Sequence, residues 1–201
     1  ALPDLEKLLK LRPKDATFSL KVALAQFGAS RLESADATLR GIPEAPDEIA
    51  GTRLLRAECA YALQRYEEAE KRLALLLERP IEPPQRERAL RVLSMARACI
   101  PLWKAEQEIR AKEAKADDLP RVRLTTSRGV IEAELFENEA PNATANFIEL
   151  IERKFYDGLK FHRVLPNFMV QGGRPQGTGG GDAGYRFKDE TQGAFRRHFR
   201  G

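Results

Sequence analysis

Hydrophobic residues follow two different periods along this chain, and the change falls near Asp117. Before it, apolar residues recur at helical spacing among Ala, Leu, Glu and Arg, which are strong helix formers. After it, Thr, Val, Phe and most of the glycines appear, and apolar residues alternate with polar ones. We therefore predict a helical region over residues 1–116, a linker over residues 117–120 that ends in a helix-breaking proline, and a β-rich region over residues 121–201.

The helical region contains an internal repeat. The run Leu32 to Ala35, followed by Leu39, corresponds to the run Tyr66 to Ala69, followed by Leu73, 34 residues later. Small residues at positions 35 and 69 let two helices approach closely, and proline-containing breaks at residues 41–46 and 80–84 fall where such pairs turn. The pattern resembles a degenerate pair of tetratricopeptide repeats, and an unspecialised helical bundle is the alternative. Either arrangement implies a scaffolding role.

A third helical stretch is predicted from about Gln85 to Lys115, with Pro101 as a candidate kink because proline removes one hydrogen bond of the helix. Its apolar positions keep near-helical spacing at Leu90, Leu93, Ala96 and Ile100. The two cysteines, Cys59 and Cys99, lie in helical segments without metal-ligand spacing. They are predicted to be buried, reduced thiols.

The β-rich region begins with a predicted hairpin. Val122 and Leu124 alternate with polar neighbours, residues 127–129 supply a turn, and residues 131, 133 and 135 alternate in turn. Pro141 opens a helix whose apolar face comprises Phe147, Ile148, Ile151 and Phe155, and which stops before residues 156–158. Two short strands, Leu159 to Val164 and Phe168 to Gln171, follow. This order implies a mostly antiparallel β structure capped by helices.

Composition and charge argue against a disordered, a nucleic-acid-binding or a membrane-spanning protein, but they do not indicate a function. Hydrophobic residues make up 42% and charged residues 32% of the chain, which is typical of a folded protein rather than a disordered one. A net charge of +4, with both signs interspersed, gives little support to nucleic-acid binding. No apolar run is long enough to span a bilayer. We expect a soluble protein with a cytoplasmic location slightly favoured, and the chain begins at Ala1, so an exported form stays open.

Residues 161–173 read FHRVLPNFMVQGG, and this segment resembles the signature of the cyclophilins. The surrounding order agrees with that family, namely the hairpin, the helix start at Pro141, the Tyr156-Asp157-Gly158 turn, and the glycine-rich stretch with Tyr185 to Glu190 after it. The resemblance implies peptidyl-prolyl cis-trans isomerase activity and the first half of an antiparallel β-barrel. The expected fold class is therefore α+β multidomain, with tetratricopeptide-like helical hairpins before that half barrel.

The family resemblance also assigns the site residues. It implies that Arg163 donates to the nitrogen of a twisted X-Pro amide, and that Gln171 holds the substrate backbone. Phe168 and Met169 are implied as walls of a pocket for the proline ring. Because isomerisation transfers no proton, His162 is expected to be structural. No cofactor and no metal are implied, since hydrogen bonding and desolvation are expected to lower the barrier.

Three other signals are weaker. Residues 179–184 formally match G-x-G-x-x-G, but no helix or βαβ unit is predicted around them. Asn142 and Thr144 form a glycosylation sequon at a helix start, where we expect them to act as caps. The tail with Arg196, Arg197, Arg200, His198 and Phe199 could touch phosphates, and a solvated loop is favoured.

The resemblance covers only part of the family domain. The family's second half supplies an aromatic floor, with a tryptophan and a histidine, that residues 121–201 do not contain, and Trp103 lies in the helical region. We therefore expect a fragment of a longer polypeptide rather than a defective gene product, weak or inactive as an isomerase by itself. The predicted function is isomerisation of X-Pro bonds in protein substrates, which assists folding like a chaperone. The expected partners are proline-containing polypeptides and a protein bound by the repeats, without nucleic acid or a membrane span. The alternative is a non-catalytic proline-peptide-binding or scaffold protein.

Overall fold

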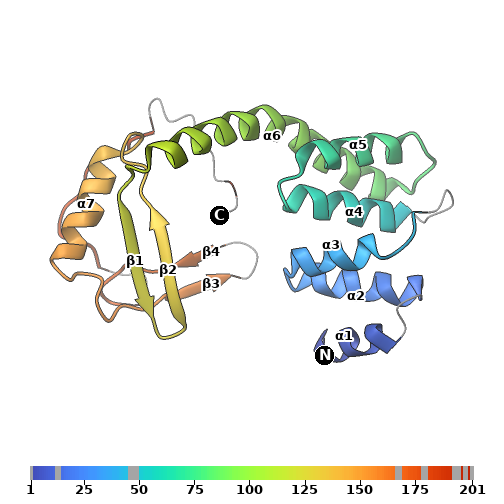
Figure 1. The fold of residues 1–201 in the computed structure, drawn as a ribbon, viewed down its shortest axis with the longest axis horizontal. Helices are drawn as coiled ribbons and strands as arrows, with labels where there is room; N and C mark the ends of the chain where they lie inside the picture. The colour runs from blue at the N-terminus through green and yellow to red at the C-terminus, as the bar shows by residue number, and fades with distance from the viewer. Residues whose placement is uncertain are drawn as a thin grey trace. The chain divides into compact units, whose positions relative to one another are not determined.

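The computed structural model describes residues 2–11, 15–44, 50–165, 169–177, 181–191, 196 and 199. The chain divides into two compact units, residues 1–106 with 197–201 and residues 107–196. Within the described residues, helices α1 to α6 come first, and the hairpin β1–β2, helix α7 and the hairpin β3–β4 follow (Figure 1). The helix-rich first region and the partial β region after it agree with the change of period in the sequence.

The helical unit is built from antiparallel neighbours. Helix α1 packs on α2, α2 on α3, α3 on α4, and α4 on α5 (Figure 1). The bounds of the helices are α1 Leu2–Leu11, α2 Ala16–Gly28, α3 Leu32–Arg40, α4 Ala50–Ala62, α5 Tyr66–Leu77 and α6 Pro83–Ala116. Within the described parts of residues 16–78 there is no strand.

The pairs α2–α3 and α4–α5 repeat one another at an interval of 34 residues. Both helices of the second pair start 34 positions after those of the first. Even the connections match, because Ser30 and Gln64 both take left-handed backbone conformations, with φ of 58° and 62°. The backbone N–H of the next residue also makes the same hydrogen bond in both connections: Arg31 N–H donates to the Gln26 carbonyl, and Arg65 N–H donates to the Ala60 carbonyl. The sequence interval therefore corresponds to a repeated helical hairpin.

The core of this unit contains the small residues that the repeat predicted. Ala35 and Ala69 are both fully buried, as are Leu39 and Leu73 to within 1%. Tyr66 is 7% exposed and lies beside Tyr61, with ring centroids 5.4 Å apart. A side chain no larger than a methyl group at positions 35 and 69 allows the helices to approach closely.

Helix α6 differs from expectation in its buried face. It continues through Pro101 as one helix. Leu90 is 48% exposed, whereas Ala89 is buried with Leu93 and Ala96. Positions 89, 93 and 96 keep the i, i+4, i+7 spacing of one helix face, so the smaller Ala89 takes the inward place expected for Leu90. Cys59 is buried as predicted, but Cys99 is only half-buried, so that part of the prediction was wrong.

A buried arginine closes the end of α3. Arg56 on α4 is 6% exposed, and its guanidinium donates to the carbonyls of Leu39 and Ile42 at 2.6 and 2.8 Å. The Leu39 carbonyl lies in the last turn of α3 and also accepts from Ile42 N–H at 3.0 Å, and the Ile42 carbonyl lies just beyond the helix. A guanidinium of the α4–α5 hairpin thus donates hydrogen bonds to carbonyl groups at the end of the α2–α3 hairpin.

Ion pairs recur along the helical unit. Arg31 binds Glu6 at 2.9 Å, Arg65 binds Asp36 at 2.5 Å, and Arg97 binds the Glu70 carboxylate at 2.8 Å. Arg31 and Arg65 occupy equivalent positions in the two hairpins, as do Asp36 and Glu70. Each of these contacts joins neighbouring helices, but Glu6 and Arg97 are not equivalent to Asp36 and Arg65, so only one partner of each ion pair follows the 34-residue interval.

The second unit opens with the predicted hairpin. Strands β1 Arg121–Thr126 and β2 Gly129–Glu134 pair in antiparallel register around a two-residue turn. Gly129 has φ of 134°, a conformation that disfavours residues with a Cβ, and this explains the glycine at the turn. Leu135, expected in the alternation, lies just after β2, where its N–H donates to the Pro120 carbonyl at 2.9 Å.

Helix α7 spans Pro141–Glu152 and begins at the predicted proline. It ends before Phe155, so that residue belongs to the following turn rather than to the helix. Thr144 and Leu150 are its buried residues, and Ile151 is 39% exposed. The buried face of α7 is therefore centred on Thr144 and Leu150 and is rotated away from the predicted face that included Ile151.

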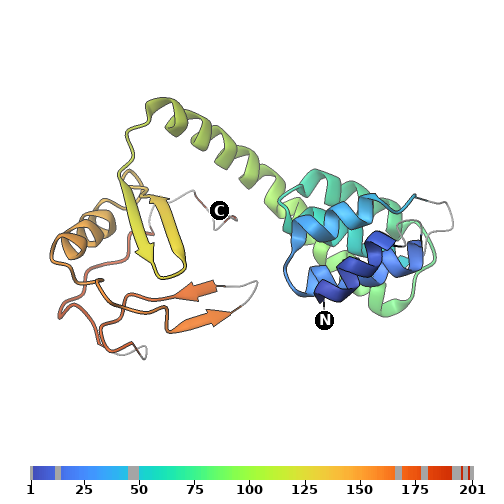
Figure 2. The ribbon, with the colours of Figure 1, turned by 60° about the horizontal axis from the view of Figure 1, so that its bottom comes forward.

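The last hairpin is shorter than predicted. β3 spans Arg163–Leu165 and β4 spans Met169–Gln171, and the two form a sheet separate from β1–β2 (Figure 2). Residues 159–162, expected as strand, have no strand partner. Gly173 lies opposite that stretch with φ of 89°, which leaves the β region and ends the ladder. No helix in the described part of the chain has the length and apolar character to cross a membrane.

Candidate functional site

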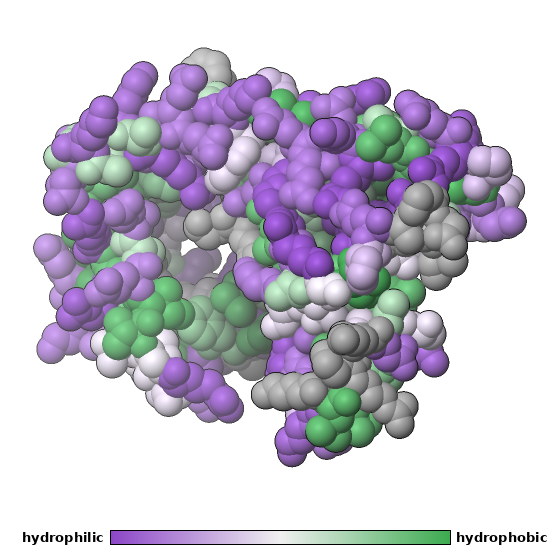
Figure 3. Space-filling view, turned by 45° about the vertical axis from the view of Figure 1, so that its right-hand side comes forward, coloured by the Kyte–Doolittle hydropathy of each residue, from purple (hydrophilic) through white to green (hydrophobic). Residues whose placement is uncertain are grey.

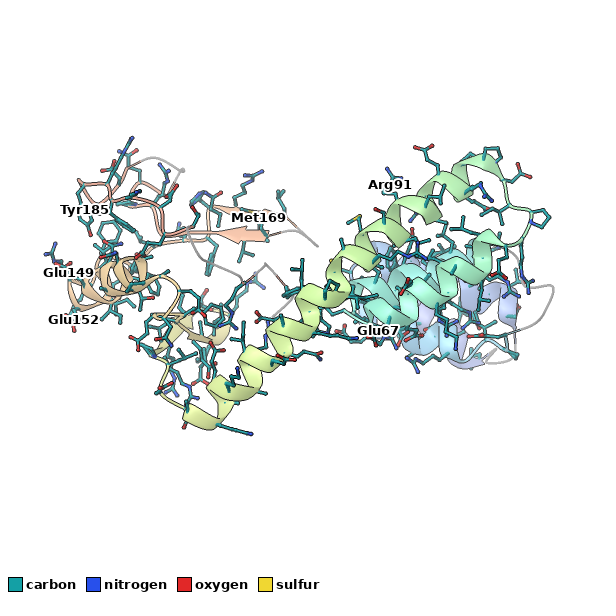
Figure 4. The ribbon with its side chains drawn as sticks, turned by 90° about the horizontal axis from the view of Figure 1, so that it is seen from above. Glu67, Arg91, Glu149, Glu152, Met169 and Tyr185 are labelled. Carbon is teal, nitrogen blue, oxygen red and sulfur yellow. The ribbon has the colours of Figure 1, made fainter. Side chains whose placement is uncertain are left out.

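The β3–β4 hairpin brings three of the four predicted site residues together. Its register pairs Arg163 with Gln171, Val164 with Val170 and Leu165 with Met169. Residues directly opposite in an antiparallel pair point to the same face, and residues two apart on a strand do so as well. Arg163, Gln171 and Met169 therefore share one face of the hairpin, and Figure 4 shows Met169 on β4. Phe168 lies outside the described residues.

The two faces of this hairpin differ in character. On the site face Arg163 is exposed, while Met169 and Gln171 are half-buried. A cation on an accessible surface beside a half-buried amide can donate to a ligand that lies across both strands. On the opposite face Val164 and Val170 are 60% and 59% exposed. Figure 3 shows that hydrophobic residues lie exposed among hydrophilic ones on one face of the molecule.

Aromatic side chains support the segment between α7 and β3. The Tyr156 ring lies 5.1 Å from that of Phe147 on α7 and 5.2 Å from that of Phe155. Burial, and then the neighbouring Tyr185, raise the pKa of the Tyr156 hydroxyl. Tyr185 in turn hydrogen-bonds to Asn146 of α7, and Figure 4 shows its side chain in this unit. The segment that leads into the hairpin is therefore anchored on α7.

A distant carboxylate caps α7. The N-cap residue Ala140 makes no side-chain cap, and neither Asn142 nor Thr144 acts as the cap that we expected. Instead Glu190 accepts from the backbone N–H groups of Asn142 and Ala143 at 3.1 and 2.8 Å, and from the Asn142 amide at 2.7 Å. The Ala143 N–H, followed by the two Asn142 donors, lowers the pKa of Glu190, while desolvation acts in the opposite sense. A carboxylate suits the positive end of a helix.

Arg196 is not part of a solvated loop, which corrects that prediction. Its guanidinium lies 3.6 Å from the centroid of the Phe136 ring and pairs with Glu113 at 2.6 Å and with Glu139 at 3.8 Å. Phe199 is also packed, 4.9 Å from the Trp103 ring. Residues 197, 198 and 200 of the same tail lie outside the described residues. Because its charge is already paired with two carboxylates and stacked on a ring, Arg196 is poorly placed to bind phosphate.

His162 is the remaining polar residue beside the site. It is half-buried, and within the described part of the chain its Nδ1 is buried without a hydrogen-bond partner. Its structural role stays a prediction. No cluster of three or more His, Cys, Asp or Glu side chains suited to a metal ion occurs among the described residues.

Comparison with known proteins places this hairpin in a family. The family model described as cyclophilin type peptidyl-prolyl cis-trans isomerase/CLD matches residues 121–201. Residues 121–201 are thus similar to the cyclophilin-type isomerases. The match covers both β hairpins and α7, so the Arg163–Gln171 pair lies within the cyclophilin-type segment. It leaves the helices up to α6 outside, and the tetratricopeptide resemblance receives no support from it.

Curated relatives agree. The cyclophilin-type segment is similar to a peptidyl-prolyl cis-trans isomerase of Synechococcus elongatus, 54% identical over 67 residues, or 33% of this chain and 46% of the relative. A Helicobacter pylori isomerase is 42% identical over 96 residues, 46% of this chain and 59% of the relative. Peptidyl-prolyl cis-trans isomerase B of Bacillus subtilis is 56% identical over 63 residues, 31% of this chain and 44% of the relative. The chain spans about half the length of the curated relatives it matches. No solved structure gives a significant match.

Proposed function

We propose that this protein is a peptidyl-prolyl cis-trans isomerase that acts on X-Pro bonds of protein substrates and so assists their folding. The observation that carries the proposal is the pairing of Arg163 with Gln171 on one strand face inside the cyclophilin-type segment. Members of this family act on proline-containing peptides, and an accessible cation beside an amide suits such a ligand.

Arg163 is assigned the catalytic role. The barrier to rotation is about 18–20 kcal/mol because the amide must lose its resonance, and in the twisted state the proline nitrogen gains a lone pair. A donor fixed toward that nitrogen binds the twisted state more strongly than either planar isomer, and this difference is what accelerates the reaction. A guanidinium stays charged and offers several donors in a rigid fork, so it suits this role better than an ammonium.

The other site residues hold the substrate. Gln171, directly opposite Arg163, can both donate to and accept from the backbone next to the proline. Met169 lies two residues before it on the same face and contributes an apolar surface for the proline ring. Phe168 is assigned a second apolar surface from the family resemblance alone. No step moves a proton, so the mechanism requires neither His162 as a base nor any cofactor.

The helical unit is proposed to recruit a protein partner as a degenerate pair of tetratricopeptide repeats. Support comes from the 34-residue recurrence of helix starts and of the connections between helices. Full burial of Ala35 and Ala69 at equivalent positions fits the close helix approach of such repeats. Loss of binding to a candidate partner on deletion of α1–α5, with isomerase activity kept, is the expected result.

An exchange experiment separates an enzyme from a peptide-binding protein. A proline-containing peptide is followed by NMR, and both the cis-trans exchange rate and the peptide affinity are measured. We expect exchange far faster than the uncatalysed tens to hundreds of seconds. Saturable binding without faster exchange would contradict the enzyme and favour the scaffold.

The length of the chain matters for this experiment. The 201-residue chain should be compared with any longer form of the protein, because it spans about half of its relatives. We expect the chain by itself to be a weak catalyst, since the family's aromatic floor is absent from it and an open site leaves water at the amide. Full activity of the 201-residue chain would refute the role given to that floor.

A further inference from the structure

The Arg163–Gln171 pair lies at the open end of its hairpin. Strands β3 and β4 form only three residue pairs, and this one is the farthest from the connecting loop. A two-stranded hairpin is marginally stable without other support. The position of the pair therefore depends on what holds the chain immediately beyond it, namely residues before 163 and after 171.

Phe161 and Gly172 meet at this end. A Cβ placed on Gly172 would lie 2.9 Å from Phe161 Cδ1, 3.3 Å from its Cε1 and 3.4 Å from the Lys160 carbonyl oxygen. Real Cβ atoms essentially never come within 3.0 Å of another heavy atom, so the ring rests directly on the glycine backbone. Phe161 is 43% exposed, so it is not a fully buried core residue. A residue with a Cβ at position 172 would therefore force the Phe161 ring or the backbone of β4 to shift.

Tyr156 lies beside the next glycine, at an ordinary contact distance. A Cβ on Gly173 would lie 3.4 Å from Tyr156 Cε1, and φ of 89° at Gly173 favours glycine independently. The Tyr156 ring packs against Phe147 of α7, with centroids 5.1 Å apart. The chain that leaves β4 is thus seated, through Tyr156, on the helix.

We propose that Tyr156 and Phe161, resting on Gly173 and Gly172, form an aromatic brace that positions the Arg163–Gln171 pair for catalysis. The inference rests on the proposed function. Gly172 adjoins Gln171, and Phe161 is two residues before Arg163, so a shift at the brace passes directly to both. These aromatic residues act through the pair and not on the substrate. Misplacing catalytic groups by about 1 Å can cost about a hundredfold in rate.

The test is Gly172→Ala in the longest available form of the protein. We expect kcat/KM to fall by about tenfold or more, mainly through kcat, because the added methyl group displaces the ring or β4. Phe161→Leu, which introduces no such clash, should lower the same rate by a smaller factor. In the Phe161→Ala background, Gly172→Ala should cost much less than alone. Gly28→Ala is the control, since a Cβ there meets nothing within 4 Å.

A second comparison shows whether the brace acts through the pair. In an Arg163→Ala background, Gly172→Ala should add little further loss of rate. A full additional loss there would overturn the proposal, as would an unchanged rate for both Gly172→Ala and Phe161→Leu.

An NMR readout keeps the test independent of activity. Cross-strand contacts between residues 163 and 171 should weaken in Gly172→Ala and recover in the double variant with Phe161→Ala. If the parent protein shows no isomerase activity, the proposed function fails. In that case the NMR contacts between residues 163 and 171 still test whether the brace positions the pair. Unchanged contacts in Gly172→Ala would overturn the proposal of the brace.

Discussion

Replacing Arg56 by methionine should destabilise the helical unit strongly. The variant keeps the length and apolar stem of the side chain but removes the donors to the Leu39 and Ile42 carbonyls. Both of these residues are buried, with exposures of 1% and 8%, so water does not readily replace the lost donors. An unsatisfied buried acceptor costs about 1–3 kcal/mol. The Leu39 carbonyl keeps a hydrogen bond from Ile42 N–H at 3.0 Å, and removing a desolvated cation offsets part of the cost, so we expect a net loss of about 1–3 kcal/mol.

Chemical denaturation followed by tryptophan fluorescence measures this effect, because the single tryptophan, Trp103, lies in the helical unit. Arg40→Met is the matched control. Arg40 is the last residue of α3, and in its ion pair with Asp36 the arginine side chain is 61% exposed. We expect a change of no more than about 0.5 kcal/mol there. Equal effects of the two substitutions would refute the account of Arg56 as the cap of α3.

Three further outcomes are expected. Ionised Glu190 should stabilise the fold above the ordinary glutamate pKa of 4.5, and this stabilisation should be lost as the pH falls through the lowered pKa of the folded state. Thermal melts should therefore show a melting temperature that falls in acid, and Glu190→Gln should abolish this part of the pH dependence. Burial, with smaller effects from nearby acidic groups, raises the pKa of the Cys59 thiol to about 12, so alkylation of the native protein at mildly alkaline pH should modify Cys99 and spare Cys59, as peptide mapping would show. Ala69→Leu, at a fully buried position, should lower the stability by about 1–3 kcal/mol in the same denaturation assay, and an unchanged midpoint would contradict the close helix approach.

The helical hairpins could be predicted from the sequence because a repeat states the same pattern twice. The 34-residue interval between Ala35 and Ala69 located α3 and α5, the second helix of each hairpin. The small size of these two alanines predicted that they would be buried. The inward face of α6 was harder, because hydrophobicity ranks Leu90 above Ala89 although geometry buries the alanine. Arg56 was missed for a related reason. A charged residue in an amphipathic pattern is normally placed outward, and the groups that pair with Arg56, the Leu39 and Ile42 carbonyls and the Glu44 carboxylate, lie outside its own helix.

The pairing of Arg163 with Gln171 follows from local sequence order, whereas the contacts that support this hairpin do not. Antiparallel pairing of two strands that are close in sequence brings Arg163 opposite Gln171, so a motif of contiguous residues contains most of that geometry. Glu190 reaches α7 across 48 residues, and Arg196 reaches Glu113 across 83 residues. Periodicity and turn chemistry hold no information on such distant partners. The contact of Phe161 with Gly172 depends similarly on a side-chain packing that the letters alone do not specify.

The most direct test of the account is the exchange rate of an X-Pro peptide measured by NMR with the parent protein and with Arg163→Ala. Arg128→Ala, at the exposed turn of the other hairpin, is the control for loss of one positive charge. The account predicts a fall of about a hundredfold or more for Arg163→Ala, as for the loss of one donor to a developing lone pair, and no change for Arg128→Ala. An undiminished rate in a folded Arg163→Ala variant would contradict it.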